Sequence, residues 1–238
     1  MPGPSIDGQT VETRAVWPGT LEVRQRGRSL AGSFPYSRSA GDRTATIRNR
    51  GRVRKERIGG DAFGWQLERF AKLQAELSQV ATEALDTVRA QAIRQELERR
   101  NLTILAGHDF NRPLGDMLSG TARARSTREA FEFEVELPDP ADQPSYMRDT
   151  VAMVRSGLAR GISPGFRVRG VPDAEAFEPE PGNPGVQIRV IRQAILPEMS
   201  IVTRPSYSET AVDMRAEDAA RAALTERRDR LRRYRPWL

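Results

Sequence analysis

The chain has 238 residues, of which 38% are hydrophobic and 29% charged, and its mean hydropathy is -0.59. This length suffices for one large domain or two small ones, and no stretch approaches the roughly 18 consecutive apolar residues that a bilayer crossing demands. The sequence contains no cysteine and one histidine, His108, which excludes disulfide scaffolds, thiol nucleophiles, thiolate zinc sites and mechanisms that need two histidines in one chain. The net charge of +6 is a weak signal for a nucleic-acid partner.

The amino-terminal part predicts β structure. Residues 1 to about 60 combine brief apolar alternations with Gly, Pro and Ser, a pattern typical of short strands and turns. The start of the chain, MPGPSIDGQT, lacks the basic residues and apolar stretch of a secretory signal. We therefore expect the protein to stay in the compartment where it is made, by default the cytoplasm.

A long helical segment follows, from Ala62 to about Arg100. Gly and Pro are absent after Gly64, and apolar residues recur at spacings of three and four. This periodicity predicts one helix of roughly 30 to 35 residues with a single apolar stripe. The helix either packs on a partner helix as a coiled-coil arm or lies across the body of the domain, and the sequence leaves both open.

The second half of the chain predicts strands and one further helix. An apolar strand runs into His108, and residues 130–138 alternate Phe, Val and Leu with Glu, which is typical of a half-buried strand. Residues 144–160 predict a helix, and a turn then leads into a strand that carries Ser163. Alternating strands follow a Pro-rich acidic loop, and an Arg-rich helix or tail follows Val212.

Ser163 is a candidate nucleophile. It lies in Gly-Ile-Ser-Pro-Gly, which matches the Gly-x-Ser-x-Gly pattern of the α/β-hydrolase nucleophile elbow. That fold places its histidine after the serine, whereas His108 precedes Ser163, and Pro164 cannot supply the oxyanion N–H that the elbow takes from this position. The α/β-hydrolase fold is therefore excluded. A Ser–His mechanism with the histidine first stays open, because triads are recognised by geometry rather than by chain order.

A third group must orient the His108 imidazole if the ring serves as the base for Ser163. The candidates are Asp109, Glu198 and the glutamates of the 130–138 strand. The strand glutamates alternate as a solvated face, whereas Glu198 lies in an otherwise apolar strand. The alternative is that His108 is an ordinary surface or hydrogen-bonded histidine.

Four sequence blocks resemble those of a known protein family. RKERIGGDAFGWQL, GHDFNRPLG, RGISPGFRV and ILPEMSIVTRPSYSETAV occur in this order. They resemble the blocks of the prohead proteases of tailed bacteriophages and gene-transfer agents, over residues 11 to 212. These capsid-maturation serine proteases share their fold with the herpesvirus assemblins.

The resemblance implies an α+β, β-rich fold: a small, mostly antiparallel barrel of about six or seven strands with flanking helices. We expect a protease domain at 1–212, with the long helix at about 62–100 as an insertion that family members lack. A basic carboxy-terminal extension is expected at 213–238.

The resemblance also assigns roles to the candidate site residues. His108 matches the general base of the family and Ser163 its nucleophile. Glu198 is placed where the assemblins have a second histidine, with Asp109 or no third residue as the alternatives. The backbone around Thr203 and Arg204 is the expected oxyanion donor.

The implied function is a capsid maturation serine endopeptidase without metal or organic cofactor. Its implied substrates are the scaffolding segment of the major capsid protein, other prohead or portal proteins and the protease itself, with self-association. It is expected to act in the bacterial host cytoplasm, inside the assembling prohead, with neither membrane nor specific nucleic acid as a partner.

The alternative function is a non-catalytic capsid scaffold or assembly protein. Its helical arm and Arg-rich tail would bind capsid protein or DNA, and the Ser–His pair would be vestigial. Scaffolding proteins are usually helical and acidic or low in complexity, which fits poorly with the strand blocks between residues 102 and 206.

Overall fold

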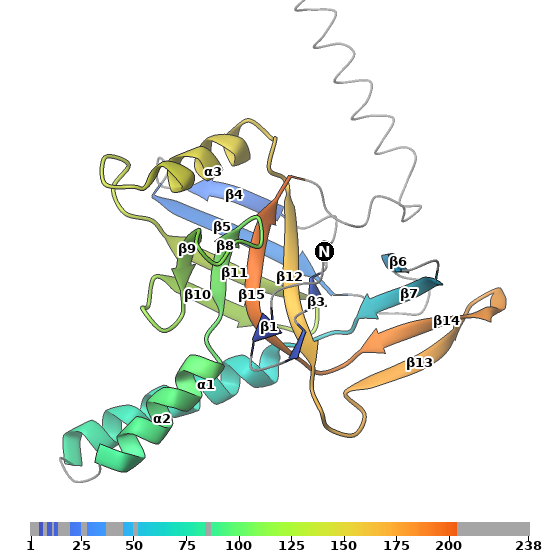
Figure 1. Cartoon of the computed structure of the whole chain (residues 1–238), viewed down its shortest axis with the longest axis horizontal. Coiled ribbons are helices and arrows are strands. Elements are labelled where there is room, and N and C mark those ends of the chain that lie inside the picture. Colours follow the sequence, from blue (N-terminus) through green and yellow to red (C-terminus); the bar gives the residue numbers. More distant parts are fainter. Residues whose placement is uncertain are drawn as a thin grey trace, which may run out of the picture. The chain divides into compact units, whose positions relative to one another are not determined.

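The computed structural model describes residues 5–6, 9–10, 12–13, 20–24, 28–36, 45–49, 52–83 and 87–203. Strands are the most abundant regular structure in this part of the chain, and three helices accompany them (Figure 1). No helix within these ranges is long and apolar enough to span a membrane. The expected basic extension at 213–238 lies outside them.

The strands form three larger sheets. The first orders β3 (Glu12–Thr13), β12 (Gly161–Val168), β15 (Ala194–Val202), β8 (Thr103–Ala106) and β9 (Pro113–Asp116). The second orders β10 (Ala122–Ser126), β11 (Ala130–Glu136), β5 (Ser29–Pro35) and β4 (Thr20–Arg24). The third orders β13 (Glu175–Glu180), β14 (Asn183–Ile191), β7 (Arg52–Ile58) and β6 (Ala45–Asn49). The strands β1 (Ser5–Ile6) and β2 (Gln9–Thr10) pair with each other.

Strand pairing confirms the predicted fold class. The pairs are antiparallel except for β15 with β8 and β14 with β7, so the molecule is β-rich and mostly antiparallel, with helices added. Among the described strands, however, no sheet closes on itself. The barrel that the resemblance implies is therefore not confirmed.

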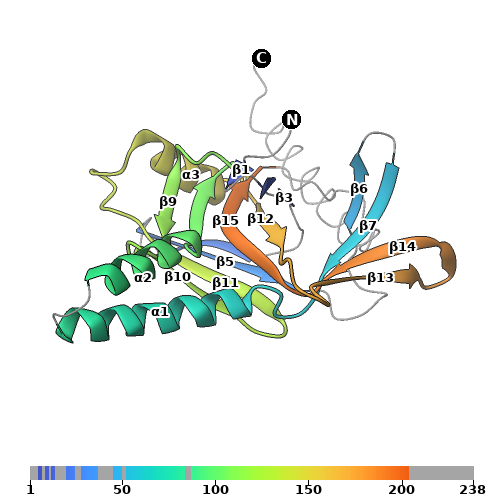
Figure 2. The same cartoon turned by 60° about the horizontal axis from the view of Figure 1, so that its bottom comes forward.

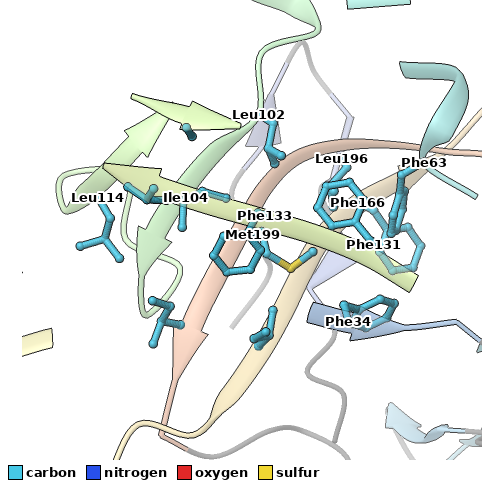
Figure 3. Packing of buried hydrophobic residues seen from close by; sticks show 14 of the residues in the cluster. Phe34, Phe63, Leu102, Ile104, Leu114, Phe131, Phe133, Phe166, Leu196 and Met199 are labelled. Carbon is cyan, nitrogen blue, oxygen red and sulfur yellow. The ribbon is translucent and has the colours of Figure 1, made fainter. Parts of the chain in front are cut away.

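Alternating side chains of the first and second sheets build one apolar core. In β11, Phe131, Phe133 and Val135 are buried while the glutamates between them are partly exposed, which confirms the half-buried strand predicted from this alternation. Figure 3 shows Phe133 beside Met199 of β15, with Phe166 of β12 near Phe131. The core thus fixes one face of β12 and β15 against the second sheet.

The other face of β12 and β15 carries polar residues. Ile162 and Ile201 belong to the core, so the alternation of a strand directs Ser163, Glu198 and Ser200 to the opposite face. These three polar residues are all buried. Buried polar groups need hydrogen-bond partners, so we expect a network of polar contacts on this face.

The helical insertion consists of two helices instead of the one expected. α1 (Gly64–Glu83) and α2 (Thr87–Arg99) lie side by side in both views (Figures 1 and 2). Their contact is a small apolar cluster of Phe70, Leu73, Val80, Ala90, Ile93 and Leu97. The apolar stripe therefore has its partner within the same insertion. The third helix, α3 (Ser145–Arg155), falls within the range predicted at 144–160.

Gln66 ties this helix pair to β15. Its side chain is buried, and its Nε2 donates hydrogen bonds to the carbonyl oxygens of Arg100 (2.9 Å) and Leu196 (3.0 Å). The Leu196 N–H donates to Gln66 Oε1 at 2.6 Å. One amide thus joins the start of α1, the residue after α2 and the strand that carries Glu198.

Replacing Gln66 by leucine is expected to lower the free energy of unfolding by about 3 kcal/mol, because a side chain of similar size leaves these buried backbone groups without their bonds. Urea denaturation measures the change. Gln74→Leu is the matched control, since Gln74 is exposed on the same helix and its replacement is expected to change stability by less than about 0.5 kcal/mol. An unchanged midpoint for Gln66→Leu contradicts the role of this contact.

Candidate active site

Ser163 is the third residue of β12 and points to the polar face of the sheet. Its strand partner is Ser200 of β15, and both residues are fully buried. The Ser163 Oγ lies 2.8 Å from His108 Nε2, within hydrogen-bond distance. A serine hydroxyl bonded to an imidazole nitrogen is the pairing that nucleophilic catalysis requires.

His108 follows the end of β8 in an unusual backbone conformation. Gly107 and His108 have φ angles of 69° and 61°, which lie in the left-handed region. The Gly107 N–H donates to the carbonyl oxygen of Ile201 (3.0 Å), and the His108 N–H donates to Ser200 Oγ (3.0 Å). These bonds attach the turn to β15, so that the ring reaches Ser163 on the next strand.

Glu198 holds the other side of the imidazole. Its side chain is 0% exposed, and its Oε1 lies 2.7 Å from His108 Nδ1. Because a carboxylate only accepts hydrogen bonds, Nδ1 carries the hydrogen, and Nε2 of the neutral ring is then free to accept the proton of Ser163. The three residues form one hydrogen-bonded chain from Ser163 through His108 to Glu198.

Gly165 makes room for this carboxylate. It pairs directly with Glu198 across the two strands, and a Cβ at this position would lie 1.9 Å from Glu198 Oε1, the oxygen bonded to His108. Any larger residue must displace the carboxylate. The sheet register therefore explains the glycine two residues after Ser163.

Gly165→Ala is accordingly expected to reduce the reactivity of the Ser163 hydroxyl by roughly 100-fold or more, because the displaced carboxylate no longer holds the imidazole in line with Ser163. The rate at which a fluorophosphonate probe phosphonylates Ser163 measures this loss. Gly170→Ala serves as the control, since a Cβ there meets nothing within 4 Å. Equal rates for the Gly165→Ala variant and the wild type contradict this account of the glycine.

Of the other predicted site residues that the structure describes, neither Asp109 nor Thr203 joins this hydrogen-bonded chain. Asp109 accepts hydrogen bonds from Asn111 and forms an ion pair with Arg112. Thr203 is exposed just beyond the end of β15, and Arg204 lies outside the described residues, so the oxyanion assignment stays a prediction.

The glutamates of β11 face away from the core, as predicted. Glu132 forms an ion pair with Arg125, and Glu134 accepts a hydrogen bond from Ser29. Within the described ranges, no group of three or more His, Cys, Asp or Glu side chains could hold a metal ion.

Two contributors to the site, Ser200 and Gly165, were not singled out from the sequence. Both stand two residues from a candidate residue within a strand, Ser200 from Glu198 and Gly165 from Ser163. Residues at this spacing share a face of the sheet, so the period of two could have placed Ser200 beside Glu198 and Gly165 beside Ser163. The contacts themselves depend on the register between β12 and β15.

Comparison with known families identifies a matching family. A model of the family described as caudovirus prohead serine protease matches residues 52–224, more than half of the chain. The matched range contains Ser163, His108, Glu198 and Ser200. Comparison with curated proteins and with solved structures gave no match.

Proposed function

Because the chain belongs to the caudovirus prohead serine protease family, we propose that it is a capsid maturation endopeptidase that works by acyl transfer through Ser163 and His108. The observation that carries this proposal is the hydrogen-bonded chain of Ser163, His108 and Glu198 on one face of a sheet. Nucleophile, base and orienting carboxylate are thus within mutual reach, which is how such sites are recognised on unrelated folds.

The reaction begins with attack of Ser163 Oγ on the carbonyl carbon of a scissile peptide bond. As the new O–C bond forms, the hydroxyl proton passes to His108 Nε2 and the carbonyl electron pair moves onto its oxygen. Glu198 accepts the hydrogen bond of Nδ1, whose hydrogen stays on the ring, and its negative charge stabilises the imidazolium. The C–N bond then breaks, the amine takes the proton from Nε2, and water attacks the acyl-enzyme by the same route.

The oxyanion that forms in this step needs hydrogen-bond donors. We assign this role to the backbone around Thr203 and Arg204, on the family resemblance. Each well-placed donor contributes on the order of 3 kcal/mol to transition-state stabilisation.

The family membership implies a prohead as the place of action and capsid proteins as partners. More finely, we propose that the substrates are the scaffolding segment of the major capsid protein, other prohead proteins and the protease itself. Cleavage inside the assembling shell, in the host cytoplasm, would remove the scaffold and make room for DNA. The proposed chemistry uses no metal or organic cofactor.

Co-expression of the full chain with the major capsid protein encoded beside it tests this function. Intact-mass spectrometry is expected to show that the capsid protein loses an amino-terminal segment when the protease is present and keeps it when the protease is omitted. The new terminus also gives the cleavage site. Assembled shells in which the capsid protein stays intact would instead favour the non-catalytic scaffold.

A further inference from the structure

We propose that Ser200 is a positioning residue of this site, which fixes the Glu198 carboxylate and the His108 backbone together. The proposal rests on the function proposed above and extends it beyond Ser163, His108 and Glu198. Ser200 Oγ lies 2.6 Å from Glu198 Oε2 and 3.0 Å from the backbone nitrogen of His108. Its role is to hold the carboxylate of Glu198 and the backbone of His108 in the positions that proton transfer from Ser163 to the imidazole requires.

The direction of these hydrogen bonds follows from their chemistry. The His108 N–H can only donate, so Ser200 Oγ accepts there, and its single proton goes to Glu198 Oε2. Glu198 Oε1 accepts from His108 Nδ1. A closed ring of bonds therefore runs from the His108 backbone through Ser200 and Glu198 to the His108 side chain.

This ring holds a conformation that histidine does not favour. With φ at 61°, His108 is in the left-handed region, which is uncommon for residues with a side chain and persists where the surroundings hold it. The bond to Ser200 is one such restraint. The same hydroxyl keeps the fully buried carboxylate from turning away from the imidazole.

Two opposed serines thus serve different purposes. Ser163 and Ser200 face each other across β12 and β15, and both are buried. Ser163 contacts the free nitrogen of the ring, whereas Ser200 contacts the carboxylate and the backbone. Ser163 is therefore the reacting group, and Ser200 acts through Glu198 and His108.

Ser200→Ala is expected to slow phosphonylation of Ser163 by a fluorophosphonate probe roughly 10- to 100-fold, the loss expected when a hydrogen bond to a charged group is removed. Ser200→Thr keeps the hydroxyl and is expected to recover most of the rate. The matched control is Ser29→Ala, because Ser29 is also buried in a strand and also donates to a glutamate, Glu134, away from the site. The rate at which the probe labels this variant should equal that of the wild type.

The imidazole itself supplies a second readout that a purely structural role would not change. His108 is the only histidine in the sequence, so nitrogen NMR of histidine-labelled protein reports this ring alone. The wild type is expected to show one tautomer, with hydrogen on Nδ1. Ser200→Ala is expected to show a mixture of the two tautomers, and Ser29→Ala the wild-type spectrum.

The outcomes separate the positioning role from the proposed function. A slower alanine variant with mixed tautomers, restored by threonine, supports the role of Ser200. A wild-type rate of probe labelling in Ser200→Ala, or a slower rate with an unchanged tautomer, overturns it. If Ser200→Ala does not fold, Ser200→Cys replaces it, because a thiol fills the site but bonds weakly. A wild type that takes up no probe and cleaves no capsid protein counts against the function, while the NMR comparison still tests Ser200.

Discussion

Replacing Ser163 with alanine is expected to lower the rate of capsid protein cleavage by roughly 10⁴- to 10⁶-fold, the range found when a triad nucleophile is removed. The substitution deletes the oxygen that lies 2.8 Å from His108 Nε2 and leaves His108 and Glu198 in contact. Neither an acyl-enzyme nor the phosphonyl ester that a fluorophosphonate probe forms with the Ser163 oxygen can then form, so covalent labelling by the probe should disappear as well. Intact-mass spectrometry of the co-expressed capsid protein measures the first effect, and mass analysis of the labelled protease the second.

A serine substitution away from the site serves as the control for Ser163→Ala. Ser156→Ala alters an exposed serine at the end of α3 and is expected to leave cleavage and labelling unchanged. Thermal unfolding of Ser163→Ala should match that of the wild type within a few degrees, which separates lost chemistry from lost folding. Continued cleavage by a folded Ser163→Ala protein would show that another residue is the nucleophile.

Replacing His108 with alanine is expected to produce a loss of the same size, roughly 10⁴- to 10⁶-fold, because Ser163 then lacks its base. The His108 side chain is 25% exposed, so its removal opens a space that is accessible to small molecules. Added imidazole is therefore expected to restore part of the activity, since Glu198 remains in place to orient it. The rate at which the fluorophosphonate probe labels Ser163, as a function of imidazole concentration, measures this rescue.

The neighbouring Asp109 provides the control for this experiment. Asp109→Ala is expected to retain near wild-type activity, because its carboxylate contacts Asn111 and Arg112 in the structure. Activity that survives in His108→Ala without imidazole removes His108 from the mechanism. A comparable loss in Asp109→Ala would instead favour Asp109 as the orienting acid.

The strands and the candidate pair, Ser163 and His108, could be predicted from the sequence. The alternation of Phe and Glu in residues 130–138 predicts β11, because apolar residues at a period of two can be buried only on one face of a sheet. His108 emerges by elimination, since it is the only histidine in the chain. The four ordered blocks predict the family, which the match over residues 52–224 confirms.

The helical insertion shows where periodicity stops being informative. Apolar residues at spacings of three and four occur in a helix that packs on another helix and in one that packs on a sheet. The pattern from Ala62 to Arg100 therefore predicts helix but does not identify the partner. The structure supplies it, because α2 lies against α1 and buries Phe70, Leu73 and Val80 together with its own apolar residues.

The sequence by itself determined the half-buried strand at 130–138, the helical character of the insertion and the short list of candidates, because periodicity and residue chemistry are local properties, and the family resemblance of its four blocks implied the fold class. Only the tertiary structure distinguished Glu198 from Asp109 as the partner of the imidazole and brought Ser200 and Gly165 to the same place. These contacts join strands that are distant in the chain. They depend on the register of β12 against β15 and on the left-handed turn at His108, which no local pattern specifies.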